Sequence, residues 1–110
     1  MLYKEALKLI IPKPKVKYIK STTNGYMVSF TIRENGLLKS EHFPEKGKGE
    51  WLISTVKEAW ALAEWFADNV DKNKIANVYV IDSNYNPVDE NGVRTITLPT
   101  YTQRKIFNKY

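Results

Sequence analysis

Apolar and polar residues alternate strictly along residues 26–33, which is the clearest strand pattern in the chain. One face of this strand would hold Tyr26, Val28, Phe30 and Ile32. A second strand is expected over residues 15–21, and the Asn24-Gly25 pair between the two segments predicts a hairpin that joins them. The sequence therefore predicts an antiparallel pair near its N-terminus.

A third strand follows the Asn35-Gly36 pair, and its register depends on the length of the turn. A two-residue loop would pair Ile32 with Lys39 and mix apolar with polar side chains. A three-residue loop with Gly36 left-handed would pair Ile32 with Leu38. We expect the three-residue loop, because it keeps apolar residues together. The outer face of the sheet would then hold Arg33, Lys39 and Glu41.

One amphipathic helix is predicted after the sheet. Residues 55–58 match a capping box, in which the Thr55 hydroxyl and the Glu58 carboxylate serve backbone donors at the helix start. The helix should run to about Asn69, with an apolar stripe of Val56, Ala59, Trp60, Ala63, Phe66, Ala67 and Val70. Trp65 falls nearly opposite this stripe, beside Leu62. Either the C-terminal third of the chain covers Trp65, which we favour, or a partner does.

The remaining segments complete a single α+β domain of 110 residues. Residues 1–14 should form a short helix over 2–10 and a proline linker, and residues 44–53 should form a loop. Residues 77–98 read as a further β-hairpin, and residues 99–110 form a basic tail. The expected fold is a three-stranded antiparallel sheet packed on one amphipathic helix over residues 15–69, followed by that hairpin and tail.

The charge distribution favours a polyanionic partner. The net charge is +5, but residues 1–48 carry ten Lys and Arg against four Asp and Glu, and residues 94–110 carry four basic residues and no acidic ones. The acidic residues gather in the middle of the chain. Lys outnumbers Arg 14 to 3, which favours contacts with phosphates over readout of base edges. We therefore expect a nucleic acid as the first candidate partner.

Several kinds of chemistry find no support in the sequence. Cysteine is absent and His42 is the single histidine, which excludes thiolate sites and histidine clusters for a metal. Residues 82–86 are similar to the opening of a calcium loop, but Pro87 stands where the turn glycine belongs, so we expect an ordinary turn. No catalytic residues, metal or cofactor are predicted. Charges within the apolar N-terminus speak against a signal peptide, and no membrane span is seen, so a cytoplasmic protein is expected.

Two separated segments carry a resemblance to a known family. They are residues 24–36 (NGYMVSFTIRENG), followed by Phe43, and residues 54–59 (STVKEA). This order of strand, Asn-Gly turn, strand and Thr-x-x-Glu-Ala helix start resembles the AP2-type DNA-binding domain, and the arm-binding domains of phage integrases are similar. The resemblance covers residues 24–69. It implies a sheet that enters the DNA major groove, contacts from Arg33 and Lys39, and a phage or mobile-element origin. The helix–strands–helix order is also similar to double-stranded RNA-binding domains.

Two functions from different classes follow as hypotheses. The first is a non-catalytic nucleic-acid-binding protein that contacts the phosphate backbone through a basic sheet face and tail. Its contacts would come from Lys15, Lys17, Lys20, Arg33, Lys39, Lys46, Lys48, Arg104 and Lys105. The alternative is a small protein–protein binder, such as a phage-type inhibitor of a host factor. Its anchors would be Leu62 and Trp65, together with the aromatic residues of the tail.

Overall fold

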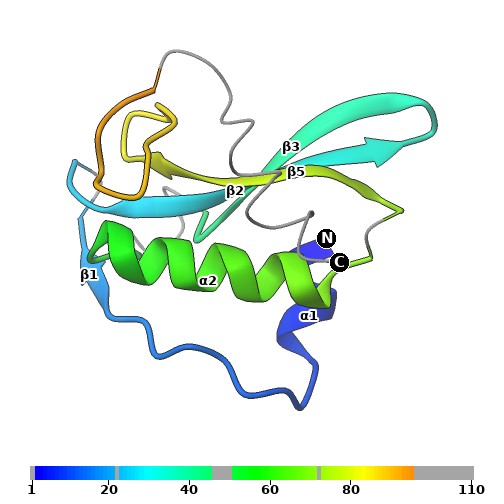
Figure 1. Ribbon diagram of the computed structural model, residues 1–110, viewed down its shortest axis with the longest axis horizontal. Coiled ribbons are helices and arrows are strands. Elements are labelled where there is room, and N and C mark those ends of the chain that lie inside the picture. The colour runs from blue at the N-terminus through cyan, green and yellow to red at the C-terminus, as the bar shows by residue number, and fades with distance from the viewer. Residues whose placement is uncertain (1, 22, 46–50, 72, 96–110) are drawn as a thin grey trace.

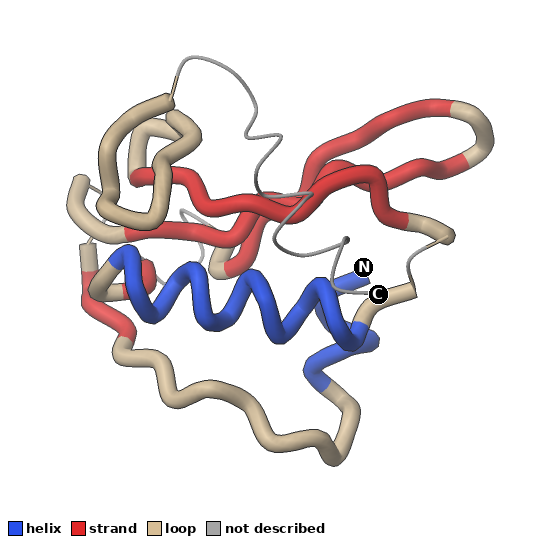
Figure 2. The backbone as a smooth tube through the Cα atoms, in the orientation of Figure 1, coloured by secondary structure: helices blue, strands red, loops and turns tan. Residues whose placement is uncertain are grey.

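The α+β fold is confirmed by a computed structural model, which describes residues 2–21, 23–45, 51–71 and 73–95 (Figure 1). The elements along the chain are α1 (Leu2–Leu7), β1 (Tyr18–Lys20), β2 (Tyr26–Glu34), β3 (Leu37–Phe43), β4 (Trp51–Ile53), α2 (Val56–Asn69) and β5 (Ile75–Asp82). These five strands form one antiparallel sheet. Both helices pack on the same face of it, so the described part of the chain has two layers (Figure 2).

β2 is the central strand of the sheet. β5 pairs along one side of it, from Tyr26 opposite Asp82 to Ile32 opposite Ile75. On the other side, β3 pairs with residues 28–34 and β4 continues the line with a single pair, Tyr26 opposite Ile53. The segment predicted to begin a separate hairpin at residue 77 is therefore part of the main sheet. Its predicted return strand is absent up to residue 95, where only isolated bridges occur, and residues 96–98 lie outside the described part.

The predicted hairpin between the first two strands is wrong, because β1 pairs with β4 rather than with β2. Gly25 has φ +108°, a conformation that side chains rarely adopt. A Cβ atom there would lie 2.8 Å from the Leu52 Cβ and 2.9 Å from the Ile53 carbonyl oxygen. This glycine is needed where the chain passes close to β4, and the Asn24-Gly25 pair does not close a hairpin.

The second Asn-Gly pair does close a hairpin, with a two-residue loop. Asn35 and Gly36 both have positive φ, at 52° and 78°, as a type I′ turn requires. The three-residue register that we expected is therefore wrong, and Ile32 lies opposite Lys39. Pairing Ile32 with Leu38 would gain little stability from apolar contact, because this end of the hairpin extends past the helices into solvent (Figures 1 and 2).

The helix was predicted correctly. Thr55 is its N-cap, and the Thr55 hydroxyl accepts from the Glu58 N–H at 3.2 Å. The Glu58 carboxylate departs from the capping-box pattern. It accepts from the Thr55 hydroxyl at 2.9 Å and from the backbone N–H of Lys17, which lies before β1. Glu58 thus ties the N-terminal segment to the start of the helix.

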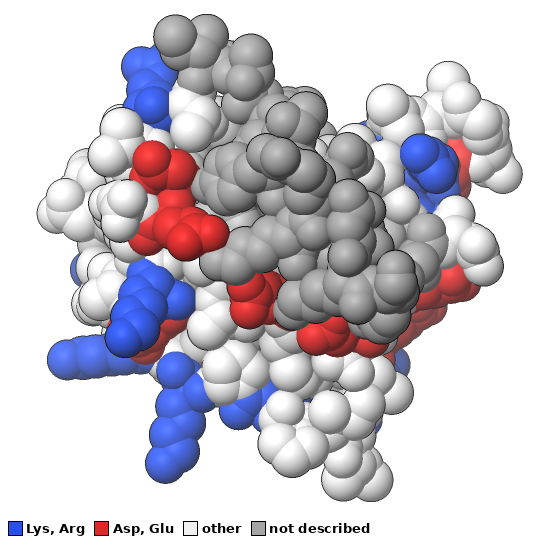
Figure 3. Space-filling view, in the orientation of Figure 1, with Lys and Arg blue, Asp and Glu red and all other residues white. Residues whose placement is uncertain are grey.

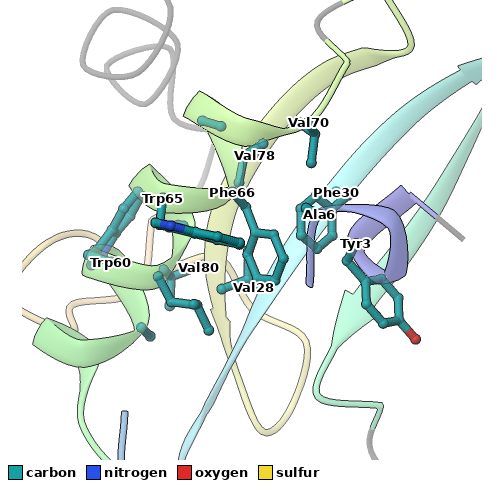
Figure 4. Packing of buried hydrophobic residues seen from close by; sticks show 14 of the residues in the cluster. Tyr3, Ala6, Val28, Phe30, Trp60, Trp65, Phe66, Val70, Val78 and Val80 are labelled. Atoms are coloured by element: carbon teal, nitrogen blue, oxygen red, sulfur yellow. The ribbon is translucent and has the colours of Figure 1, made fainter. Parts of the chain in front are cut away.

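Two apolar clusters hold the layers together. The larger one lies between the sheet and both helices, where the Phe30 ring meets the Phe66 ring edge to face at 5.0 Å (Figure 4). Tyr3 of α1 stacks on Phe30 at 6.0 Å and closes one end of this core. The smaller cluster lies on the opposite face of the sheet and holds Met27, Leu52 and Ile81, all essentially buried. β2 is therefore covered on both faces over its first half.

Candidate nucleic-acid interface

Residues 11–17 form an extended strap that connects α1 to β1 and runs along α2 (Figure 1). The indole N–H of Trp65 donates to the Pro12 carbonyl oxygen at 2.8 Å. At the other end of the strap, the N–H of Lys17 donates to the Glu58 carboxylate. Val16 packs against the main core between these two points. The strap is thus fixed to the helix along its length.

The predicted protein-binding anchors are not at the surface, and the strap lies against one of them, Trp65. Trp65 is 8% exposed and Leu62 is 3% exposed. We expected the C-terminal third of the chain to cover Trp65, whereas its indole is bonded to the N-terminal strap. A hot-spot anchor has to be accessible to its partner before binding. Neither residue can anchor a partner in this structure, so the protein-binder hypothesis loses the two residues on which it rested.

The lysines of the strap are exposed. Exposure alternates along it, with Lys13, Lys15 and Lys17 exposed and Pro14 and Val16 partly buried. Extended backbone rises about 3.3 Å per residue, so alternate lysines are about 6–7 Å apart. Lys13 has a structural role, because its ammonium donates to the Leu7 carbonyl oxygen at 3.0 Å and lies 5.8 Å from the centre of the Trp65 ring.

β1 follows the strap directly and carries a further exposed lysine together with exposed aromatic rings. Lys20 lies directly opposite Trp51 on β4, and the Trp51 side chain is 48% exposed. Tyr18, two residues before Lys20 on the same face of β1, is 39% exposed, and one edge of its ring meets Phe43. Partial burial raises the pKa of the Tyr18 hydroxyl, which therefore stays protonated and neutral at pH 7. We call Lys15, Lys17, Tyr18, Lys20 and Trp51 the basic edge.

The sequence analysis singled out the lysines of the basic edge but missed both aromatic residues. β4 is only three residues long, which is too short for an alternation to be recognised. The pairing that places Trp51 beside Lys20 joins segments about thirty residues apart. A usable signal was the large apolar residue that directly follows the charged, glycine-rich residues 46–50.

The predicted reader face of the sheet does not exist in the observed register. Arg33 and Lys39 lie on opposite faces of the β2–β3 hairpin, because Lys39 pairs with Ile32. Lys39 forms an ion pair with Glu34 at 2.7 Å. Its hydrogen bond and charge lower the pKa of the Glu34 carboxyl, and Glu34 in turn raises the pKa of Lys39. Four further predicted contacts, Lys46, Lys48, Arg104 and Lys105, lie outside the described residues.

Acidic residues gather on the face of the molecule shown in Figure 3, and one acidic residue, Glu58, lies beside the basic edge, because its carboxylate accepts from the Lys17 N–H. Figure 3 shows them in a band across the middle of one face, with several blue side chains at the lower left, where β1 and the start of α2 lie in Figure 1. Glu64 and Asp68 of α2 contribute to the acidic side of the helix.

Other candidate chemistry is weak in the described part of the chain. No group of three or more His, Asp or Glu residues there could hold a metal ion. The Asp82 carboxylate accepts from the N–H groups of Asn84 at 2.8 Å and Asn86 at 3.0 Å, which makes this segment a turn, as expected. His42 is half-buried against the Tyr85 ring, and burial lowers the pKa of its imidazole. No described helix is long and apolar enough to cross a membrane.

Comparisons with protein-family models, curated proteins and solved structures found no match to this chain. The structure defines a small, mixed α+β domain with an antiparallel sheet, and the basic edge is its candidate functional surface.

Proposed function

We propose that this protein binds nucleic acid without catalysing a reaction, and that the basic edge is its contact surface. One observation carries the proposal: exposed lysines lie on the edge strand β1 and in the segment directly before it, next to the exposed rings of Tyr18 and Trp51, with Lys20 paired directly to Trp51. Lysine ammonium groups suit phosphates as point charges. Flat aromatic side chains give unpaired bases a surface on which to stack.

The arrangement favours single-stranded over double-stranded nucleic acid. A base can stack on Trp51 or Tyr18 only where it is free of its complement, and stacking of this kind contributes about 1–3 kcal/mol per base. The lysine row follows an extended backbone, which matches a single strand laid along it. A duplex would offer its phosphates to the lysines but would leave the rings without a partner.

The test is a fluorescence-anisotropy titration of the full chain with labelled oligo-dT, a single-stranded RNA and a DNA duplex at several salt concentrations. Neutralising Lys15, Lys17 and Lys20 together with glutamine should weaken binding strongly. Three phosphate contacts predict that the slope of log K against log salt becomes about 2 less steep for single strands. Trp51→Ala should weaken binding to oligo-dT about tenfold, because it removes one stacking surface.

A matched control neutralises three exposed lysines elsewhere. Lys4 lies in α1, Lys8 directly follows α1, and Lys74 directly precedes β5. In Figure 1, α1 lies at the end of α2 that is farther from β1, and the chain enters β5 from the same end. Replacement of the three lysines by glutamine changes the net charge by the same amount. Binding should change little in this control. Equal losses in both triple variants would show that only overall charge matters and would overturn the basic edge as a site. No binding of any probe at low salt would overturn the function itself.

A further inference from the structure

The β2–β3 hairpin projects past the helices, and β3 is its outer strand (Figures 1 and 2). Within the described part of the chain, β3 pairs only with β2. Leu37 is 72% exposed and Leu38 is 65% exposed, so the hairpin carries apolar surface close to its turn. An exposed edge strand with apolar side chains is a template for pairing with another strand.

The backbone groups on this edge follow from the turn. Glu34 and Leu37 flank the two-residue loop and form a hydrogen-bonded pair, and such pairs alternate along an antiparallel ladder. The residues between the hydrogen-bonded positions therefore direct their N–H and C=O groups away from β2. These residues are Leu38, Ser40 and His42. They offer donors and acceptors along the open side of β3, centred on Ser40.

The sequence of β3 is complementary to itself about Ser40. We propose that a second copy of this chain pairs with β3 in antiparallel fashion, with the two-fold axis at Ser40. Lys39 of one copy then lies opposite Glu41 of the other, on the same face and twice by symmetry. Leu37 lies opposite Phe43, so an apolar pair closes each end of the strand. The charges that would discourage pairing with an arbitrary strand therefore favour pairing with an identical one.

The hydrogen-bonding groups fit the same register. Ser40 faces Ser40 of the partner, and Leu38 faces His42, so every residue with outward backbone groups meets another such residue. A register shifted by two residues would bring the Asn35-Gly36 turn or the residues after Phe43 into the ladder. The centre at Ser40 is the one that uses all seven residues of β3. The proposal rests on this geometry and is independent of nucleic-acid binding.

The dimer should be weak, because a single pair of strands buries less than the roughly 1,200 Å² of stable complexes. Sedimentation velocity from low micromolar to near-millimolar concentration should show a reversible monomer–dimer equilibrium. Lys39→Glu should weaken it about tenfold or more, because two attractive pairs become two repulsive ones. Glu41→Lys should do the same. The two variants mixed should associate again, since every carboxylate then faces an ammonium group.

Two substitutions at Ser40 provide a second test that leaves the charges in place. Ser40→Pro removes a backbone donor that faces away from β2, a position at which an edge strand tolerates proline. It should abolish association, whereas Ser40→Ala should not change it. A wild-type chain that stays monomeric throughout would overturn the proposal. So would a dimer that survives Ser40→Pro, or single charge variants that fail to associate when mixed although each melts as the wild type does.

Discussion

The two halves of β2 share one pattern of alternation but lie in different surroundings. Residues 27–30 are almost fully buried on both faces, with 1% exposure or less. Arg33 and Glu34, a few residues further on, are exposed, and so are the residues of β3 beside them. Met27 on the outer face is as buried as Phe30 on the inner face. Burial along this strand is decided by what covers it and not by its own alternation.

This difference in burial gives the two halves of β2 different roles. The covered half holds the sheet to α2 and carries most of the stability that β2 provides, because apolar burial is the main favourable term in folding. The projecting half contributes little to the core and is free to meet another molecule. Substitutions at matched positions in the two halves should therefore differ widely in their cost.

The largest contrast is expected between Phe30→Ala and Leu38→Ala. Phe30 is fully buried against Phe66 and Tyr3, so truncation leaves a cavity and should cost about 3–5 kcal/mol. Leu38 is mostly exposed, and its truncation should change stability by less than about 0.5 kcal/mol. Denaturant unfolding of both variants measures the difference. Similar costs would show that the projecting half is part of the core after all.

A second contrast uses the two Asn-Gly pairs. Gly25→Ala should cost about 2–4 kcal/mol, because the new methyl group meets both a side chain and a carbonyl oxygen at 2.8–2.9 Å and the backbone stays at φ +108°. Gly36 has open space around it, so Gly36→Ala should cost only the left-handed conformation, about 1–2 kcal/mol. Thermal or denaturant unfolding ranks the two. A larger loss at Gly36 would contradict the close approach at Gly25.

These two glycines also show which parts of the fold could be predicted from the sequence. The helix, its N-cap at Thr55 and the presence of a strand at β2 are local patterns, and all three were predicted correctly. The partner of β1 was not, because pairing of residues 18–20 with 51–53 depends on contacts far apart in the chain. An Asn-Gly pair indicates that a left-handed glycine is present but does not say what the glycine is needed for.

The candidate site shows the same limit. Lys15, Lys17 and Lys20 could be named from charge alone, whereas Arg33 and Lys39 were placed on one face by a register error of one residue. Trp65 was expected opposite the apolar stripe, but it is buried in the same core cluster as the stripe, and the strap bonded to it comes from a distant part of the sequence. Extended proline segments give no signal of the surface on which they pack. Long-range packing decided each of these outcomes.

His42 lies near the junction of the two halves and should make stability depend on pH. Burial lowers the pKa of its imidazole in the folded chain, so the unfolded chain binds the proton more readily. The stabilisation is complete above the ordinary value of 6.5 and is lost as the pH falls toward the lower folded value. The midpoint of denaturant unfolding should therefore drop as the pH falls below 6.5. His42→Gln should flatten this drop, and an unchanged drop would assign it to other groups.

The smallest effect is expected at the ion pair of the projecting half. Glu34 and Lys39 are both 54% exposed, and exposed pairs of this kind contribute little to stability. Glu34→Gln should leave the unfolding midpoint at pH 7 unchanged at physiological salt. Glu58, at the start of α2, provides the contrasting case, because its carboxylate accepts hydrogen bonds from both the Lys17 N–H and the Thr55 hydroxyl. Glu58→Ala should lower the midpoint measurably, since it removes one of the hydrogen bonds that hold the strap to α2. If Glu34→Gln cost as much as Glu58→Ala, the projecting hairpin would need its ion pair to stay folded, and the division of β2 into a structural half and a free half would be wrong.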